Sequence, residues 1–469
     1  MVDGEGVTLP GVTVWRQSAD VAAATPPDRD RVVDLLRAGS LLVVVLGHVL
    51  MVVVRWQGER PHIANVLAEV PLLDLATWLL QVMPVFFAAG AIANRISYSS
   101  AVARGEPWRT WVWHRVRRLV RPVVYYLACW AVIVVVMGAL IPEAANTLAR
   151  LSTQLLWFLG AYFLVIATTQ WQIRLARRGI APVVGLVALI AVTDVARFHM
   201  VAGVAVLNFF TVWFMAATLG LVARDRVEHG RRSLVAVALG ALVVNIALVV
   251  AFPYPESMVG MPGDKISNMA PPTIVLALHA VMLISVVALL WPALTRLCAR
   301  PRVWRCVVAA GAAAMTVYLW HLTALLAVVE GEHLLGFTRG PVDELDFWLG
   351  TLVHLAVSLA AIGLLVAVVV PLEHLPVPWL EHPHDHLGDS PGWTALAAIG
   401  VLACGVGFLV LAATGMGGFP FDRVTAYAGF PLTPGLGTIL VVVGAVACRT
   451  AGSRVRPAAM LGNEAHDLR

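Results

Sequence analysis

Twelve long apolar runs constrain the fold of this chain more than any other feature. A helix needs about 20 mostly apolar residues to cross a bilayer, and the runs reach about that length with few charges inside them. Only 13% of all residues are charged and 59% are hydrophobic, so a soluble globular domain is excluded. We predict an all-α polytopic integral membrane protein of about 12 transmembrane helices. The runs are 35–54, 72–94, 122–141, 153–170, 180–196, 200–223, 232–252, 272–295, 306–329, 347–370, 393–414 and 432–449.

The placement of basic residues predicts an orientation. If the N-terminus is cytoplasmic and the runs alternate, most of the 33 Lys and Arg residues fall on the cytoplasmic side or at the inner ends of spans. The outer segment 330–346 is acidic. We therefore expect a plasma-membrane protein with both termini in the cytoplasm. Since the placement of the charges sets membrane orientation, the net charge of +5 does not indicate affinity for nucleic acid, and no nucleic-acid partner is expected.

Composition along the chain predicts five segments. Residues 1–30 form a polar cytoplasmic tail without an evident cleavable signal peptide. Residues 31–370 form a ten-helix core and residues 371–392 a cytoplasmic connector. Residues 393–449 hold two additional helices, and 450–469 a cytoplasmic tail. The sequence predicts no particular oligomeric state.

The first apolar run carries three ionisable residues in a regular arrangement. Arg37 and His48 are eleven residues apart, almost three helical turns, so they share one face and lie about 16 Å apart along the axis. Asp34 precedes Arg37 by one turn and can pair with it. An ionisable group inside a membrane is by default a functional hypothesis, and a neutral imidazole can accept a proton. His48 is thus a candidate general base; the alternative is a histidine that only bonds two helices together.

A second group of residues lies in the expected loop 95–121. Arg115, Arg118 and Arg121 recur every three residues among tryptophans. Guanidinium groups match phosphate oxygens in geometry, which suggests an anionic ligand. The alternative is anchoring of the cytoplasmic loop, with or without anionic lipid.

Two further groups of residues are candidates for a site. Tyr318 and His321 lie in the ninth run, where plain helix packing is the alternative to a site. The histidines of segment 382–386 could bind a metal, but a solvated connector is the favoured interpretation. The five cysteines lack metal-type spacing, and no metal is predicted.

Taken in order, these motifs resemble the acyltransferase family 3 of integral membrane proteins over about residues 29–370. The family's Arg-x-x-Arg before a proline-led helix is met by Arg115 and Arg118 ahead of Pro122, although Arg118 and Arg121 have the same spacing. The other matching stretches are Asp34, Leu35, Arg37 and His48 of the first run, Pro84–Phe87 with Gly90, Leu156–Leu159, and Tyr318–His321.

The resemblance implies an acyl-CoA, expected to be acetyl-CoA, as co-substrate and no bound cofactor. The acceptor would be a hydroxyl of a carbohydrate, glycolipid or similar molecule. Ala89 replaces a serine common in the family, and no acidic residue follows the Trp157 motif, which argues against a peptidoglycan acetylator. The implied site consists of His48, Arg37 and Asp34 in catalysis, Arg115, Arg118 and Arg121 at the donor, and Trp157, Tyr318 and His321 at the substrate.

Two other functions compete with this one. A twelve-helix secondary transporter fits the number of spans, but no internal repeat is evident and Asp194 is the clearest carboxylate inside a span. A lipid-linked sugar transferase would usually carry acidic residues in a large outer loop, and none is evident.

Overall fold

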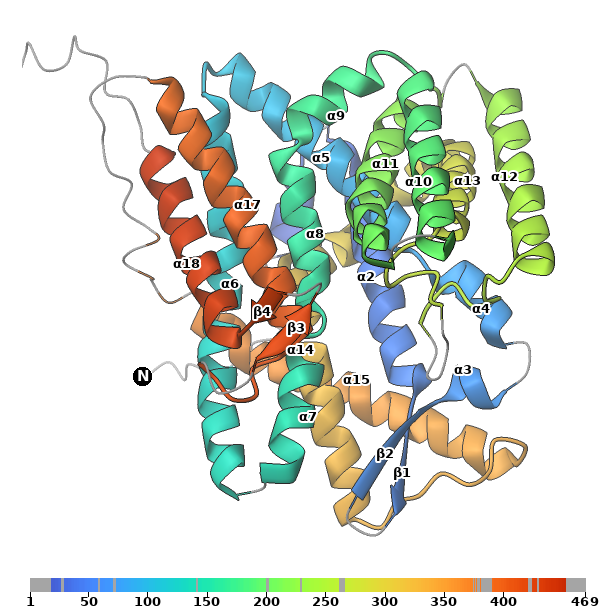
Figure 1. Ribbon diagram of the computed structural model, residues 1–469, viewed down its shortest axis with the longest axis vertical. Coiled ribbons are helices and arrows are strands. Elements are labelled where there is room, and N and C mark those ends of the chain that lie inside the picture. The colour runs from blue at the N-terminus through green and yellow to red at the C-terminus, as the bar shows by residue number, and fades with distance from the viewer. Residues whose placement is uncertain are drawn as a thin grey trace, which may run out of the picture. The chain divides into compact units, whose positions relative to one another are not determined.

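A computed structural model of the chain confirms the predicted fold class. Among the residues it describes, twelve helices are long and apolar enough to cross a membrane, and strands are almost absent (Figure 1). Each of the twelve overlaps one predicted run, but several extend beyond it; Trp108–Leu140, for example, begins 14 residues before the run 122–141. The histidines of segment 382–386 lie outside the described residues. The description covers residues 18–26, 29–57, 60–70, 73–140, 142–199, 202–227, 230–260, 266–373, 375, 377, 380, 390–420, 424–427 and 430–452.

The chain folds into two compact units, each made of two stretches of sequence. Unit 1 comprises residues 1–93 and 171–372, and unit 2 comprises residues 94–170 and 373–469. Helix α5 (Met83–Ala103) begins in unit 1 and ends in unit 2. The helices beyond the ten-helix core therefore belong to unit 2, together with the predicted basic stretch.

Unit 1 is built around α2 (Arg31–Met51), which packs against α13 (Ile274–Cys298) and α14 (Pro301–Leu334). Two antiparallel strands, β1 (Val52–Gln57) and β2 (Arg60–Asn65), follow α2 as a hairpin. Unit 1 also contains α3 (Val66–Glu69), α4 (Leu73–Leu80), α9 (Thr169–Ala176), which begins in unit 2, α10 (Ala181–His199), η1 (Ala202–Ala205), α11 (Val206–Asp225), α12 (Arg231–Ala251) and α15 (Leu345–Glu373), whose last residue falls in unit 2.

The first span ends earlier than its apolar run. The run extends to residue 54, whereas α2 stops at Met51 and the chain continues as β1. Three consecutive valines begin the strand, and β-branched side chains favour extended backbone over helix. His48 consequently lies in the last turn of α2 and not deep within the span, which corrects the predicted depth of this residue.

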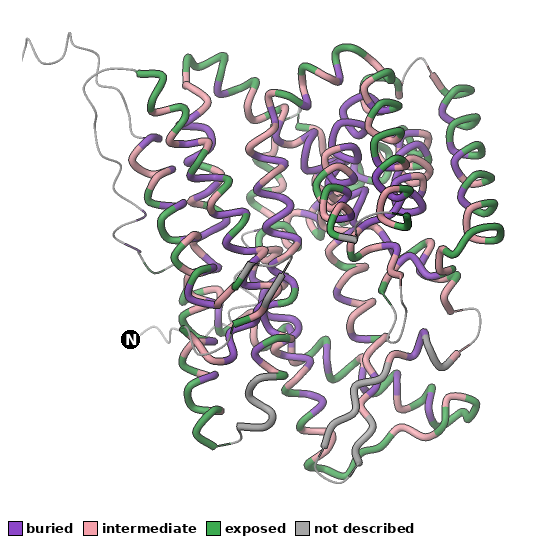
Figure 2. Tube along the Cα trace, viewed as in Figure 1, coloured by how far each residue is buried: buried purple, intermediate pink, exposed green. Residues whose placement is uncertain are grey.

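Helix α12 buries one face against unit 1 and exposes the others. Its buried residues Leu234, Ala238, Ala241 and Asn245 recur at helical spacing and form one stripe, and α12 packs against α13. The other faces are exposed and carry valine, leucine and isoleucine (Figure 2). An exposed apolar surface of this kind suits contact with lipid chains.

Asp194, in the C-terminal third of α10, lies within a network of hydrogen bonds. Its carboxylate accepts the backbone N–H of Ile274 at 2.7 Å, the Nδ2 of Asn208 at 2.9 Å and the hydroxyl of Tyr254 at 3.2 Å. Ile274 opens α13, so the carboxylate satisfies a helix N-terminus that would otherwise lack an acceptor. Burial, then the neighbouring Asp194 carboxylate, raises the pKa of Tyr254. Asp194 thus joins three segments, a structural task rather than the proton relay of a transporter.

Replacement of Asp194 tests this structural role. Asp194→Ala should lower the free energy of unfolding by about 3 kcal/mol, because buried donors lose their acceptor. The measurement is thermal unfolding of the purified protein in detergent. Glu330→Ala, which removes an exposed carboxylate, should leave the midpoint unchanged. A wild-type midpoint for Asp194→Ala would contradict the role.

Unit 2 is organised by one long helix, α6 (Trp108–Leu140), which carries Pro122 inside it. The predicted loop 95–121 was wrong: α5 continues to Ala103, and α6 begins at Trp108. Gly105 adopts a φ of 73° that ends the first helix, and Pro107 precedes the second. The other elements of unit 2 are α7 (Pro142–Thr153), α8 (Leu156–Ala167), α17 (Pro391–Thr414), β3 (Thr425–Tyr427), β4 (Phe430–Leu432) and α18 (Pro434–Ala451).

Glycines let α17 approach its neighbours at backbone distance. A Cβ on Gly407 would lie 2.7 Å from the carbonyl oxygen of Gly437 in α18, and one on Gly400 would lie 2.7 Å from that of Gly444. On its other side, a Cβ on Gly160 of α8 would lie 2.8 Å from the carbonyl oxygen of Gly405. Small residues at helix interfaces are a common means of packing in membranes. The C-terminal helices are therefore packed tightly into unit 2 (Figure 1).

A matched pair of substitutions measures this packing. Gly407→Ala should lower the free energy of unfolding by about 2 kcal/mol, because the new methyl group meets backbone atoms that cannot turn aside. Gly363→Ala in α15 adds the same methyl group where nothing lies within 4 Å, and helix propensity predicts a gain of up to about 1 kcal/mol. Equal unfolding midpoints for the two variants would contradict the close approach.

Candidate functional site

Two histidines from α2 and α14 meet in unit 1. The Nδ1 of His48 lies 3.0 Å from the Nε2 of His321, a hydrogen-bonding distance, and the ring centroids are 5.2 Å apart at an interplanar angle of 20°. His321 is fully buried, whereas His48 is half-buried. The contact unites two residues that the sequence placed 273 positions apart. His48 therefore does bond two helices together, as the structural alternative required.

The two histidines differ in the partners of the ring nitrogen that does not take part in their contact. The Nδ1 of His321 lies 3.0 Å from the carbonyl oxygens of both Val317 and Tyr318, one turn earlier in α14. Both ring nitrogens of His321 are thus occupied. Among the described residues, no hydrogen bond reaches the Nε2 of His48. A nitrogen with no protein partner is the atom on which a substrate proton or acyl group can act.

Arg37 lies on the same face of α2, about three turns before His48. Its guanidinium carbon is 5.8 Å from the ring centroid of Phe86. Its Nε is buried, with no hydrogen-bond partner in the described part of the chain. A guanidinium group so close to the membrane interior is costly to maintain without a partner. Arg37 therefore has a donor available for a ligand.

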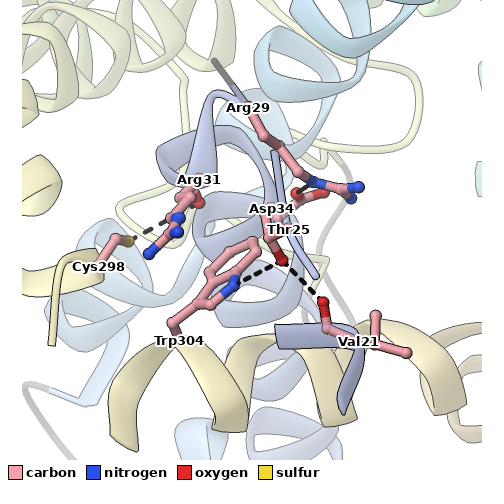
Figure 3. A network of polar contacts seen from close by, with 7 residues as sticks. All are labelled: Val21, Thr25, Arg29, Arg31, Asp34, Cys298 and Trp304. Atoms are coloured by element: carbon pink, nitrogen blue, oxygen red, sulfur yellow. Dashed lines mark hydrogen bonds and ion pairs between the residues drawn. The ribbon is translucent and has the colours of Figure 1, made fainter. Parts of the chain in front are cut away.

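The expected Asp34–Arg37 pair is replaced by another. Asp34 accepts from the Nε of Arg29 at 2.8 Å (Figure 3). Arg29 precedes α2, and its side chain extends forward to Asp34 in the first turn of the helix. A carboxylate at that position also stabilises the helix dipole. Asp34 therefore stabilises the start of α2, and no carboxylate pairs with Arg37 within the described part of the chain.

Two arginine–tryptophan contacts near the start of α2 were not predicted from the sequence. The guanidinium group of Arg31 lies 4.9 Å from the Trp304 ring, whose Nε1 donates to Thr25 at 3.0 Å (Figure 3). Arg224 donates to Asp30 at 3.1 Å and covers the Trp291 ring at 4.8 Å. In the sequence, only the frequency of arginine near the ends of the apolar runs indicated these contacts.

A narrow apolar crevice in unit 1 opens beside Arg224. Leu36 of α2, Ala88 of α5 and Gly220 of α11 are among its lining residues. Gly220 permits this close packing, since a Cβ there would lie 2.5 Å from that of Ala88. Leu36, one of these lining residues, directly precedes Arg37 in α2. The crevice itself is lined almost entirely by aliphatic groups.

The three arginines predicted at the donor differ in their surroundings within unit 2. Arg115 is half-buried; it contacts the hydroxyl of Ser97 and lies 5.7 Å from the Trp111 ring. Trp111 also donates to Ser97 at 2.9 Å, so the three side chains hold one another. Arg118, one turn on, is exposed.

Arg121 is engaged with the connector. Its Nη2 donates to the carbonyl oxygen of Leu375 at 2.7 Å, and the hydroxyl of Tyr125 donates to the same oxygen at 2.8 Å. This contact fixes the chain where it leaves the ten-helix core. Arg121 therefore differs from Arg115 in its contacts, because it donates to a backbone oxygen of the connector.

The sequence also matches a known protein family. A family model described as an acyltransferase domain matches residues 30–370, well over half of the chain. The chain belongs to acyltransferase family 3. No curated protein and no solved structure matches it. The protein is therefore a multi-pass membrane acyltransferase, as the ordered motifs predicted.

The matched segment of this acyltransferase contains every predicted site residue. His48, Arg37 and Asp34 lie on α2, and Tyr318 and His321 lie in the buried stretch of α14. Trp157 belongs to unit 2, where it is half-buried against Phe158 with ring centroids 6.2 Å apart. No group of histidine, cysteine or acidic residues suited to a metal ion occurs among the residues described.

Proposed function

We propose that this acyltransferase transfers an acyl group, expected to be acetyl, from acyl-CoA to a hydroxyl of a carbohydrate, glycolipid or similar acceptor. The observation that carries the proposal is the His48 ring, held through Nδ1 by His321 while its Nε2 has no partner among the described residues. A positioned histidine of this kind is suited to general base catalysis.

The proposed reaction moves one proton and one acyl group. His48 removes the proton from the acceptor hydroxyl, and the oxygen attacks the thioester carbonyl carbon. A C–O bond forms, the C–S bond breaks, and the CoA sulfur leaves with the proton that His48 returns. In the alternative route, His48 attacks the thioester itself and carries the acyl group until the hydroxyl accepts it. Both routes need the Nε2 of His48 to be accessible.

Arginines of each unit are proposed to contact the donor. The buried, unpartnered Nε of Arg37 supports a role at the donor's polar groups, three turns from His48. In unit 2, Arg115 and Arg118 are suited to the phosphates of CoA, because Arg115 is pre-positioned by Ser97 and Trp111 and Arg118 is exposed. Arg121 was also expected at the donor. We now assign it to the connector, because it already donates to Leu375.

Location and orientation follow from charge. The arginine-rich inner ends support a plasma-membrane protein with both termini in the cytoplasm, so that acyl-CoA approaches the start of α2. His48 would then lie near the outer end of α2, where a carbohydrate acceptor outside the cell could reach it. The rival secondary transporter loses its clearest proton carrier, because Asp194 is bonded to three other groups.

Replacement of His48 tests the proposal directly. His48→Ala should lower acetyl-CoA turnover by about 10²–10⁴-fold, because the proton acceptor is removed. The measurement is release of CoA thiol from acetyl-CoA by proteoliposomes that also contain lipid extract from the producing cells. His279→Ala, at another fully buried span histidine, should keep near-normal turnover. Wild-type turnover by His48→Ala would contradict the proposed role of His48.

Replacement of two arginines tests the donor site. Arg115→Ala combined with Arg118→Ala should raise the KM for acetyl-CoA about tenfold or more, because charge-assisted bonds to phosphate are lost. Arg104→Ala, at an exposed arginine paired with Glu106 in the neighbouring turn, serves as the control and should leave KM unchanged. An unchanged KM in the double variant would return these arginines to membrane anchoring.

A further inference from the structure

We propose that His321 is a positioning residue that holds His48 in its Nδ1–H tautomer, so that Nε2 of His48 is the reacting nitrogen. The inference rests on the proposed function, since it concerns the same histidine. It names the atom that accepts the proton and assigns His321 a task other than lining the acceptor side.

The backbone of α14 determines which nitrogen of His321 carries its hydrogen. The Nδ1 of His321 lies 3.0 Å from the carbonyl oxygens of Val317 and Tyr318. A carbonyl oxygen can only accept, so Nδ1 of His321 must carry the hydrogen. In a neutral imidazole the other nitrogen then has a lone pair and no hydrogen. The Nε2 of His321 is therefore an acceptor.

The hydrogen position in His321 fixes the one in His48. Its Nδ1 lies 3.0 Å from the Nε2 of His321. Since that nitrogen accepts, Nδ1 of His48 must donate, and Nε2 of His48 is left with the lone pair. The backbone of α14 thus determines which nitrogen of His48 can take a proton, through one intervening ring.

The other arrangements are less favourable. A neutral His321 with its hydrogen on Nε2 would direct the bare Nδ1 at two carbonyl oxygens. A doubly protonated His321 would place a charge in a fully buried position, with no carboxylate hydrogen-bonded to it in the described chain. If His321 donated from Nε2 and His48 accepted at Nδ1, the hydrogen of His48 would lie on its Nε2. That nitrogen could then not accept a proton.

Two substitutions of similar chemistry separate this role from others. The side-chain oxygen of glutamine is four bonds from Cα, as is the Nε2 of histidine, so His321→Gln can still accept from His48. The oxygen of asparagine is three bonds from Cα, the reach of Nδ1, so His321→Asn cannot. We expect His321→Asn to lower kcat about 10²-fold with the KM for acetyl-CoA unchanged, and His321→Gln to stay within about tenfold of wild type.

A spectroscopic measurement reports the tautomer itself. The protein is labelled with ¹⁵N in its histidine rings, and the signals of His48 are identified as those absent from His48→Ala. Wild type and His321→Gln should show His48 with the hydrogen on Nδ1, and His321→Asn should lose this preference. The pair His279→Gln and His279→Asn, at a fully buried histidine of α13, should change neither kcat nor the His48 signals.

The outcomes distinguish the two proposals. Wild-type turnover by His48→Ala would overturn the proposed function whatever His321 does. An inactive His48→Ala together with a fully active His321→Asn and an unchanged tautomer would overturn only the positioning role. Loss of activity to the same extent in His321→Gln and His321→Asn would mean that His321 itself exchanges protons, which also contradicts the inference.

Discussion

An apolar solvent that offers no hydrogen bonds is the constraint on which this structure depends. Within a bilayer every backbone group must be satisfied by the chain, so the spans are helices. The same constraint applies to side chains: Asp194 finds three donors, and His321 finds two carbonyl oxygens and a second imidazole. In unit 1, the buried Nε of Arg37 has no hydrogen-bond partner in the described part of the chain. Together with the open Nε2 of His48, it is where the proposed function would place a ligand.

The twelve helices could be predicted from the sequence because span length and hydropathy depend on the bilayer and not on tertiary contacts. Boundaries were harder. The span containing His48 stops at Met51 because valines favour the hairpin that follows, and the basic loop is helical because a glycine and a proline confine the break to 104–107. Each depends on local backbone preference, to which an apolar run is insensitive.

The site was predictable as a set of residues but not as a set of partners. The spacing of Arg37 and His48 follows from helix periodicity alone. The pairing of His48 with His321 depends on how α2 packs against α14, and no local pattern in the sequence contains that information. The expected Asp34–Arg37 pair was wrong for a related reason: Arg29, from outside the helix, competes for the same carboxylate with fewer restrictions on its direction. A charge spacing shows which residues can interact, while the surrounding chain decides which do.

The contact of α17 with α18 has a consequence for how this protein can vary. At two levels of the interface, Gly400 with Gly444 and Gly407 with Gly437, the space for one side chain is already filled by the other helix's main chain. Enlargement of either member alone forces the two axes apart along their whole length. Tolerated substitutions at these levels must therefore arise together, or together with a shift of the whole helix pair, so the four positions should covary among related chains.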